Sequence, residues 1–368
     1  MGLRSIKGKG IQVAQGADVE TIVGTYRSSS RRKVLGMLFF LLLIILASGF
    51  AMGIGSYEIS FTGVYSMIWE HLTHWSDGYT SVDMRVVWEQ RLPRLLFAII
   101  SGAGLAATGA AMQSMLKNPL ADSYTTGISS GASFGATLAI TMGITVGGFV
   151  GNVGIVANAF LFSLIPSAVI LGLSIMKKAS PSTMILAGIS VMYIFNALTS
   201  YMMLVADEQS MSAAYEWTMG SLSKASWNTM PIMFIVTAVG SFLIFYMSRY
   251  LNAMNAGDDF AKTLGVNVQR IRVVLLAIIS IVAASIVSFT GIIGFVGLVG
   301  PHMARIVIGS DNKYLIPASM LTGATIMVVC DIIAKAFTHV AIPIGIVTSL
   351  IGGPVFLILI LRQRKEVW

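Results

Sequence analysis

The chain is poor in charged residues and has a single cysteine. Only 11% of its 368 residues are charged, whereas 55% are hydrophobic. A soluble domain of this size needs more charge to cover its surface, so the composition indicates a protein that crosses a membrane several times. Because lipid offers no hydrogen-bond partners, long apolar runs must form helices. The lone Cys330 excludes a disulfide within the chain and a cysteine-based metal site.

The sequence also lacks the motifs of common catalytic and cofactor sites. It contains no Gly-x-x-x-x-Gly-Lys-Ser/Thr loop for ATP and no His-Glu-x-x-His metal motif. His71 and His74 have helical spacing but no third ligand nearby, so we expect solvated side chains rather than a metal site. The net charge of +8 is scattered at the ends of apolar runs, which indicates membrane orientation rather than nucleic-acid binding. We therefore expect no enzyme activity, cofactor or metal.

Apolar runs account for most of the chain. Most of them reach the roughly 20 residues that a helix needs to cross the hydrocarbon core of a bilayer. The eighth run is short, rich in glycine and broken by Pro301, so hydropathy alone leaves its crossing open. The runs predict an all-α polytopic membrane protein with about ten transmembrane helices, at 34–54, 94–115, 125–142, 152–175, 183–205, 228–248, 271–290, 294–308, 315–336 and 343–361.

The distribution of Lys and Arg favours ten crossings over nine. With ten crossings and a cytoplasmic N-terminus, 19 of the 24 Lys and Arg residues lie on the cytoplasmic side. With nine, the basic C-terminal residues would lie outside, against the positive-inside preference. We therefore predict cytoplasmic termini, a disordered basic tail at 1–33, a transmembrane domain at 34–362 and a short cytoplasmic tail at 363–368.

Glycines recur within the predicted spans. Gly127, Gly131 and Gly135 follow one another at intervals of four residues, so they share one helix face. The second span contains a similar group around Gly102 and Gly109. Small residues on a helix face let two helices approach closely, and we interpret most of these glycines as packing positions.

A polar segment at 251–272 interrupts the apolar pattern on the predicted cytoplasmic side. An acidic pair at 258–259 stands where a short helix would begin, the end that favours negative charge. Gly265 stands where such a helix would end. Phe260 and Leu264 are four residues apart and share a face. The segment fits one or two short amphipathic helices that seat on a soluble partner, although a solvated connector between two spans would look similar.

Two proline-containing breaks lie on the same predicted side. The first is Asn118-Pro119-Leu120 after the second span, and the second is 179–183 between the fourth and fifth spans. Proline prevents the helix from continuing and leaves backbone that must face protein or water. Either break could be an ordinary turn, but two on one side also suit the mouth of a pathway.

Ionisable residues within the apolar runs are few. Asp331 and Lys335 are four residues apart on one predicted helix, so their side chains can pair. Such a pair fits a snorkelling lysine as well as it fits a proton relay. A proton-driven protein usually has a chain of buried carboxylates or histidines, and Asp331 alone qualifies here.

Two longer segments lie on the predicted outer side. The segment 55–93 carries three tryptophans, a residue that favours the membrane interface, and ends in Arg91-Leu-Pro-Arg94. The segment at about 206–227 contains Glu216 and Trp217 and is expected to hold a short surface helix. Arg91, Arg94 and Lys335 are the cations nearest the outer ends of their spans, where they could simply anchor helix ends.

Short motifs run in order along residues 34–362. They are Arg91-Leu-Pro-Arg94, Gly109-Ala-Ala-Met-Gln113, Lys117-Asn-Pro-Leu-Ala121, Gly127-Ile-Ser-Ser-Gly-Ala132, Leu264-Gly-Val266, Gly294-Phe-Val-Gly-Leu-Val299 with Pro301-His302, Leu315-Ile-Pro-Ala318, and Ile342-Pro-Ile-Gly-Ile-Val-Thr348 with Gly353-Pro354. Together they resemble the FecCD-type permeases of binding-protein-dependent ABC importers, which carry ferric siderophores, haem or cobalamin. The longer N-terminal tail, Lys335 in place of an arginine and Gly300 before Pro301 depart from the usual pattern.

The resemblance implies partners and roles that the residues alone do not give. It implies a ten-helix subunit in a dimer, with two cytoplasmic ATPase subunits and a substrate-binding protein outside. The segment 251–272 would dock on the ATPase, and the outer cations would receive acidic residues of the binding protein. The implied residues are Asp258, Asp259, Phe260, Ala261, Leu264 and Gly265 for ATPase coupling, Asn118, Pro119, Leu120, Pro181 and Ser182 for the cytoplasmic gate, and Arg91, Arg94 and Lys335 for docking.

These expectations define one function and one alternative. The first is a membrane permease that transports a metal chelate, is driven by a separate ATPase and, as the resemblance implies, forms a homodimer. The alternative is a secondary transporter coupled to protons or sodium. Uptake that persists without ATP while the proton gradient is held would favour the alternative.

Overall fold

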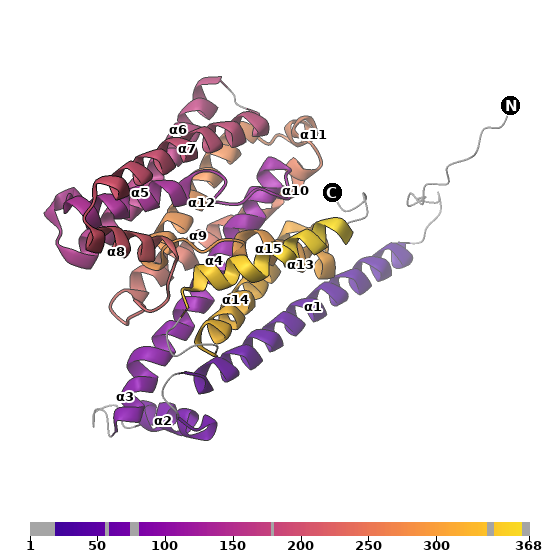
Figure 1. Ribbon diagram of the computed structural model, residues 1–368. Coiled ribbons are helices and arrows are strands. Elements are labelled where there is room, and N and C mark those ends of the chain that lie inside the picture. The colour runs from indigo at the N-terminus through magenta and orange to yellow at the C-terminus, as the bar shows by residue number, and fades with distance from the viewer. Residues whose placement is uncertain (1–18, 56–58, 74–80, 178–179, 337–341, 363–368) are drawn as a thin grey trace.

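A computed structural model describes residues 19–55, 59–73, 81–177, 180–336 and 342–362 (Figure 1). Helices and their connections make up this part of the chain, with no strand in it. The helices are α1 (Val19–Gly53), α2 (Phe61–Thr73), α3 (Val82–Val86), α4 (Leu92–Leu116), α5 (Ile128–Met142), α6 (Gly151–Lys177), α7 (Pro181–Val205), α8 (Glu208–Thr218), α9 (Met230–Tyr246), α10 (Ser248–Asn255), α11 (Asp258–Thr263), α12 (Val268–Thr290), α13 (Val296–Ile308), α14 (Asn312–Ala336) and α15 (Ile344–Arg362).

Each of the ten apolar runs coincides with one helix. Among the described residues, six helical segments are long and apolar enough to cross a membrane, and α9 with α10 would make a seventh span bent by 50°. The remaining runs form the shorter apolar helices α5, α13 and α15. The all-helical membrane architecture predicted from the sequence is therefore confirmed, whereas the number of crossings and the orientation of the termini stay predictions.

The first helix extends further toward the N-terminus than the sequence predicts. α1 begins at Val19, within the segment 1–33 that the sequence predicts as a tail. A helix that is already formed by an apolar run adds one hydrogen bond for each residue by which it grows, and no proline stops it here. Residues 1–18 and the predicted tail at 363–368 lie outside the described residues.

The α4 helix occupies the centre of the molecule, packed between α14, α13, α9 and α12. A turn of π-helix, Val87–Arg91, joins it to α3. Glycines set its spacing: a methyl group on Gly102 would collide with the backbone of Gly323 in α14, and one on Gly109 with Gly297 in α13. Gly131 and Gly135 bring α5 against the backbone of α6 in the same way. The interpretation of these glycines as packing positions is confirmed.

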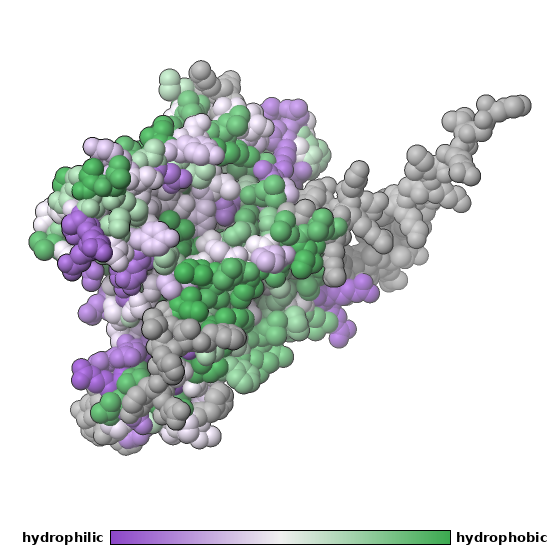
Figure 2. All heavy atoms as spheres, in the orientation of Figure 1, coloured by the Kyte–Doolittle hydropathy of each residue, from purple (hydrophilic) through white to green (hydrophobic). Residues whose placement is uncertain are grey.

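Apolar surface faces outward over the long helices. Leu and Phe side chains of α1, α7 and α9 are exposed, and Figure 2 shows hydrophobic atoms gathered over α15 and α1. Hydrophilic atoms gather over α8 and α11, which lie on opposite sides of the molecule. An apolar belt between two polar ends is the surface that a bilayer requires.

Candidate functional site

The turn after α4 is held in one shape by hydrogen bonds of its own residues. Lys117 ends the helix in the left-handed region with φ 49°, and the side chain of Asn118 accepts a hydrogen bond from the Leu120 backbone N–H at 2.9 Å. The Ala121 N–H in turn donates to the Asn118 carbonyl. Leu120 is 48% exposed at the tip of this turn. The predicted gate residues 118–120 therefore form an ordered turn that presents one leucine to its surroundings.

The second predicted gate segment lies at the start of α7. Pro181 occupies the first turn of this helix, and the Ser180 hydroxyl caps it by accepting a hydrogen bond from the Thr183 N–H. Ser182 is exposed. Met184 of α7 and Ala121 after the first turn belong to one buried apolar cluster. The fold thus brings the two proline-containing breaks to the same region.

The polar segment forms two short helices, as predicted. α11 has Asp258 and Asp259 in its first turn, where the helix dipole favours negative charge. It ends in a Schellman motif, in which Gly265 has φ 79° and the Val266 N–H donates to the Ala261 carbonyl. Glycine suits this position because a positive φ strains other residues.

One face of α11 presents apolar side chains to solvent. Phe260 is 52% exposed and Leu264 is 59% exposed, while Ala261 between them is buried against the protein. Two large apolar groups on an otherwise charged surface helix are unusual for a plain connector. The face is of the kind that an amphipathic helix lays into the groove of a partner.

An ion-pair chain joins α11 to the end of α4. The Lys117 ammonium lies 3.0 Å from one oxygen of Asp258, and the Arg272 guanidinium of α12 lies 2.7 Å from the other. Partial burial of Asp258 would raise its pKa, but hydrogen bonds from Lys117 and Arg272 outweigh burial and hold the pKa below its usual range. Such a carboxylate stabilises the fold above its ordinary pKa and loses this contribution only as the pH falls through that range. The Asp258 carboxylate is therefore ionised at neutral pH.

A second link, made mainly of amide side chains, lies at the same end of the molecule. The Asn252 side chain of α10 accepts hydrogen bonds from the Asn312 backbone and amide at 2.8 and 2.9 Å. Asn312 in turn accepts a hydrogen bond from the Ser114 hydroxyl of α4 at 2.8 Å, and Asn252 also donates to Asp311 at 2.8 Å. Lys33 of α1 lies 3.5 Å from Asp311. The residues at 33, 114–120, 252–272 and 311–312 thus gather at one end of the molecule.

The outer cations lie in a different setting from the one expected. Arg91 is only 6% exposed and donates to the Met52 carbonyl at 2.7 Å. Arg94 lies 2.8 Å from a carboxylate oxygen of Asp331, and Lys335 pairs with the other oxygen. The predicted Asp331–Lys335 pair is confirmed. Docking of a binding protein on the three cations stays a prediction, and in this fold internal carbonyl and carboxylate groups hold their side chains.

A histidine expectation also fails. His71 is buried and its ring packs on the Trp88 indole with 4.5 Å between centroids, so it is not the solvated residue that the sequence suggested. His71 lies on α2, a short amphipathic helix whose apolar face packs against the protein. His74 lies outside the described residues.

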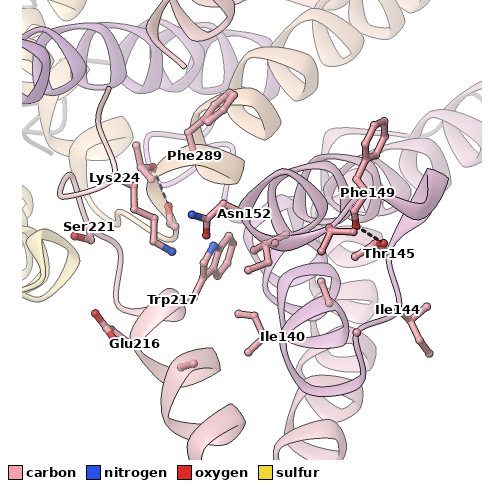
Figure 3. Close-up of a pocket in the computed structure, with 18 of the residues that line it drawn as sticks. Ile140, Ile144, Thr145, Phe149, Asn152, Glu216, Trp217, Ser221, Lys224 and Phe289 are labelled. Atoms are coloured by element: carbon pink, nitrogen blue, oxygen red, sulfur yellow. Dashed lines mark hydrogen bonds between the residues drawn. The ribbon is translucent and has the colours of Figure 1, made fainter. Parts of the chain in front are cut away.

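A pocket of about 790 Å³ lies on the side of the molecule away from α11. It forms where α8, the connection between α5 and α6, and the end of α12 meet. In Figure 3 the Trp217, Asn152 and Lys224 side chains point into this space and Glu216 lies at its edge. The sequence predicted the short helix α8 but not the pocket, because no sequence pattern shows that three distant segments converge.

Comparisons with known proteins agree with this arrangement. The chain is 35% identical over 336 residues to the hemin transport system permease protein of Yersinia pestis, covering 91% of this chain and 97% of that protein. It is 39% identical over 289 residues to the cobalamin import system permease protein of Halobacterium salinarum, covering 78% and 76%.

A solved structure has the same fold. It is an inward-facing transporter assigned to the metal-chelate type of ABC transporters, with a TM-score of 0.78, 30% identity and coverage of 89% of this chain and 99% of that chain. The model of the FecCD transport family matches residues 40–362, which is most of the sequence. The chain therefore belongs to the FecCD transport family and is a multi-pass membrane protein.

Proposed function

We propose that this chain is the membrane permease of a binding-protein-dependent ABC importer for a metal chelate, with a ferric siderophore as the first candidate cargo and haem or cobalamin as the next. Relatives named for hemin and cobalamin transport support this class of cargo. In this proposal ten helices cross the cell membrane and both termini are cytoplasmic. Two copies of the chain form the pathway between them.

The exposed apolar face of α11 is the observation that carries the proposal. Phe260 and Leu264 stand out from a charged helix, and the same helix is tied through Asp258 to the turn that holds Leu120. Each of two permease subunits would seat this helix in a groove of one cytoplasmic ATPase subunit. ATP hydrolysis in the partner would then move α11, and α11 would move the turn that holds Leu120.

The gate in this proposal consists of two turns. Asn118, Pro119 and Leu120 form the first, and Pro181 with Ser182 forms the second. The shared apolar cluster behind them supports a joint movement, because side chains packed in one cluster shift together. Their closing would separate the pathway from the cytoplasm while the outer side is open.

A substrate-binding protein would dock at the opposite end. The pocket at α8 and the exposed Lys224 beside it support an outer contact surface. Direct contacts by Arg91, Arg94 and Lys335 would require these side chains to leave their present partners. Within the docking surface we therefore give them the role of holding the outer end of α4 in place.

Replacement of the apolar face tests the proposal. Phe260→Asp with Leu264→Asp should reduce binding of the ATPase by about 100-fold, because buried aromatic and aliphatic anchors carry roughly 2–4 kcal/mol of an interface. The measurement is the amount of ATPase that co-purifies with the tagged chain from membranes, followed by titration of the purified subunits.

A matched control places the same charge elsewhere. Lys313→Asp changes an exposed residue in the first turn of α14 at the same end and should leave ATPase binding within about two-fold. Full binding by the Phe260 and Leu264 double variant, with the chain folded, would contradict the proposal.

A further inference from the structure

The end of α4 and the start of α11 are far apart in sequence but share one charged contact. Lys117 is the residue directly before Asn118, so its position decides where the 118–120 turn begins. Its ammonium reaches Asp258 across 3.0 Å, with both side chains about one-third exposed. A displacement of α11 must either carry Lys117 with it or break this pair.

Asp258 differs from its neighbour Asp259 in what it joins. Asp259 has a side chain that is 97% exposed and pairs with Lys262 within α11. Asp258 instead bridges two other elements, with Lys117 on one oxygen and the almost buried Arg272 of α12 on the other. Asp259 therefore makes an ion pair within its own helix, whereas Asp258 makes ion pairs with two other elements.

The backbone conformation at Lys117 is fixed by its surroundings. A lysine in the left-handed region is uncommon, and surrounding contacts are needed to hold it there. The Asn118 N–H donates to the Gln113 carbonyl, which fixes the inner side of the turn to α4. The Lys117 side chain then joins the turn to α11, so a displacement of either one can move the other.

We propose that Asp258 is a positioning residue that transmits the movement of α11 to the gate turn 118–120 through Lys117. This inference rests on the proposed function, in which α11 seats on an ATPase. Asp258 does not contact the cargo or the nucleotide in this scheme. Arg272 holds the carboxylate in the orientation that presents its other oxygen to Lys117.

The experiment measures gate movement without any cargo. Cys330, the single native cysteine, is replaced by Ala, and Leu120→Cys is introduced as the reporter. The chain is purified with the ATPase that co-purifies with it and placed in lipid vesicles. The rate of maleimide labelling at position 120 is compared between nucleotide-free and ATP-bound states.

The parent reporter should change its labelling rate by about five-fold or more on ATP binding. Lys117→Met should reduce this change to less than about two-fold, while the ATPase stays bound and hydrolyses ATP. Lys117→Asn is the second variant, because asparagine tolerates a left-handed backbone but is too short to reach Asp258. Lys117→Arg keeps the charge and should restore at least half of the response.

Two further variants test the pair itself. Asp258→Asn should lose the response like Lys117→Met, and the double variant should lose no more than either alone, because both changes break one link. Lys313→Met removes a cation at the same end without touching the link and should respond like the parent.

The outcomes separate this inference from the function on which it rests. Both the proposed function and this inference would be overturned if the labelling rate of the parent reporter did not change on ATP binding, or if the chain bound no ATPase. A parent that responds together with Lys117→Asn and Asp258→Asn variants that respond equally well would overturn the relay alone. Loss of ATPase binding in Lys117→Asn would also overturn it, because the pair would then serve docking rather than transmission.

Discussion

Both ends of α4 are held by an aspartate between two cations, yet the two arrangements differ. At the outer end, Asp331 is 1% exposed and joins Arg94 to Lys335, which lies on the same helix as Asp331. At the other end, Asp258 is 30% exposed and joins Lys117 to Arg272 across three separate elements. The same chemistry therefore gives a buried clamp at one end and a partly hydrated link at the other.

Their surroundings explain why only one of them suits a moving part. The outer clamp lies beside the place where α4 and α14 touch through backbone at Gly102 and Gly323, so the two helices cannot slide without separating. In the link to α11, the side chains of Lys117 and Asp258 are about one-third exposed, whereas Arg272 behind them is buried. A partly hydrated ion pair can reorient with a moving helix while its two side chains stay in contact, whereas a buried pair must keep its geometry.

The largest effect is expected from the outer aspartate. Asp331→Asn should lower the free energy of unfolding by about 3–5 kcal/mol, because two cations would stay buried without a balancing charge. Lys117→Met should lower it by about 1 kcal/mol or less, because the pair of Lys117 with Asp258 is partly hydrated and Asp258 keeps Arg272. Thermal unfolding of the purified chain in detergent checks both. Equal losses for the two variants would remove the distinction between clamp and link.

A smaller effect is expected from the helix contact beside the clamp. Gly102→Ala should destabilise the chain by about 1–3 kcal/mol, because the added methyl group meets the Gly323 carbonyl. Gly172→Ala is the matched control in α6, where nothing lies within 4 Å of the added group. This control should be neutral or slightly stabilising, since alanine favours a helix over glycine. Unchanged stability of Gly102→Ala would mean that α4 and α14 can separate at little cost.

Local patterns in the sequence predicted the elements well. The ten apolar runs, the amphipathic start of α11 at Asp258, its end at Gly265 and the pair at Asp331 and Lys335 all depend on residues within about one or two helical turns. Helix spacing and capping rules operate at this range. The extension of α1 to Val19 was missed, because propagation of an existing helix depends on its neighbour rather than on the segment itself.

Contacts between distant residues could not be read in this way. Lys117 and Asp258 carried no sequence sign of pairing, and the pocket at Trp217 needs three separate segments. The burial of Arg91 and the ion pair of Arg94 with Asp331 were missed for a related reason. A cation near the end of a span looks the same in sequence whether it faces water or a buried carboxylate on another helix.

The central claim is that α11 engages the ATPase and moves the gate turn with it. Structures of the complete transporter in lipid, without nucleotide and with ATP, test this most directly. The account predicts Phe260 and Leu264 seated in the ATPase in both states, with the Lys117 ammonium staying within about 4 Å of Asp258 as Leu120 changes position. An α11 that stands clear of the ATPase, or a Leu120 that moves while Lys117 and Asp258 lie apart, would contradict it.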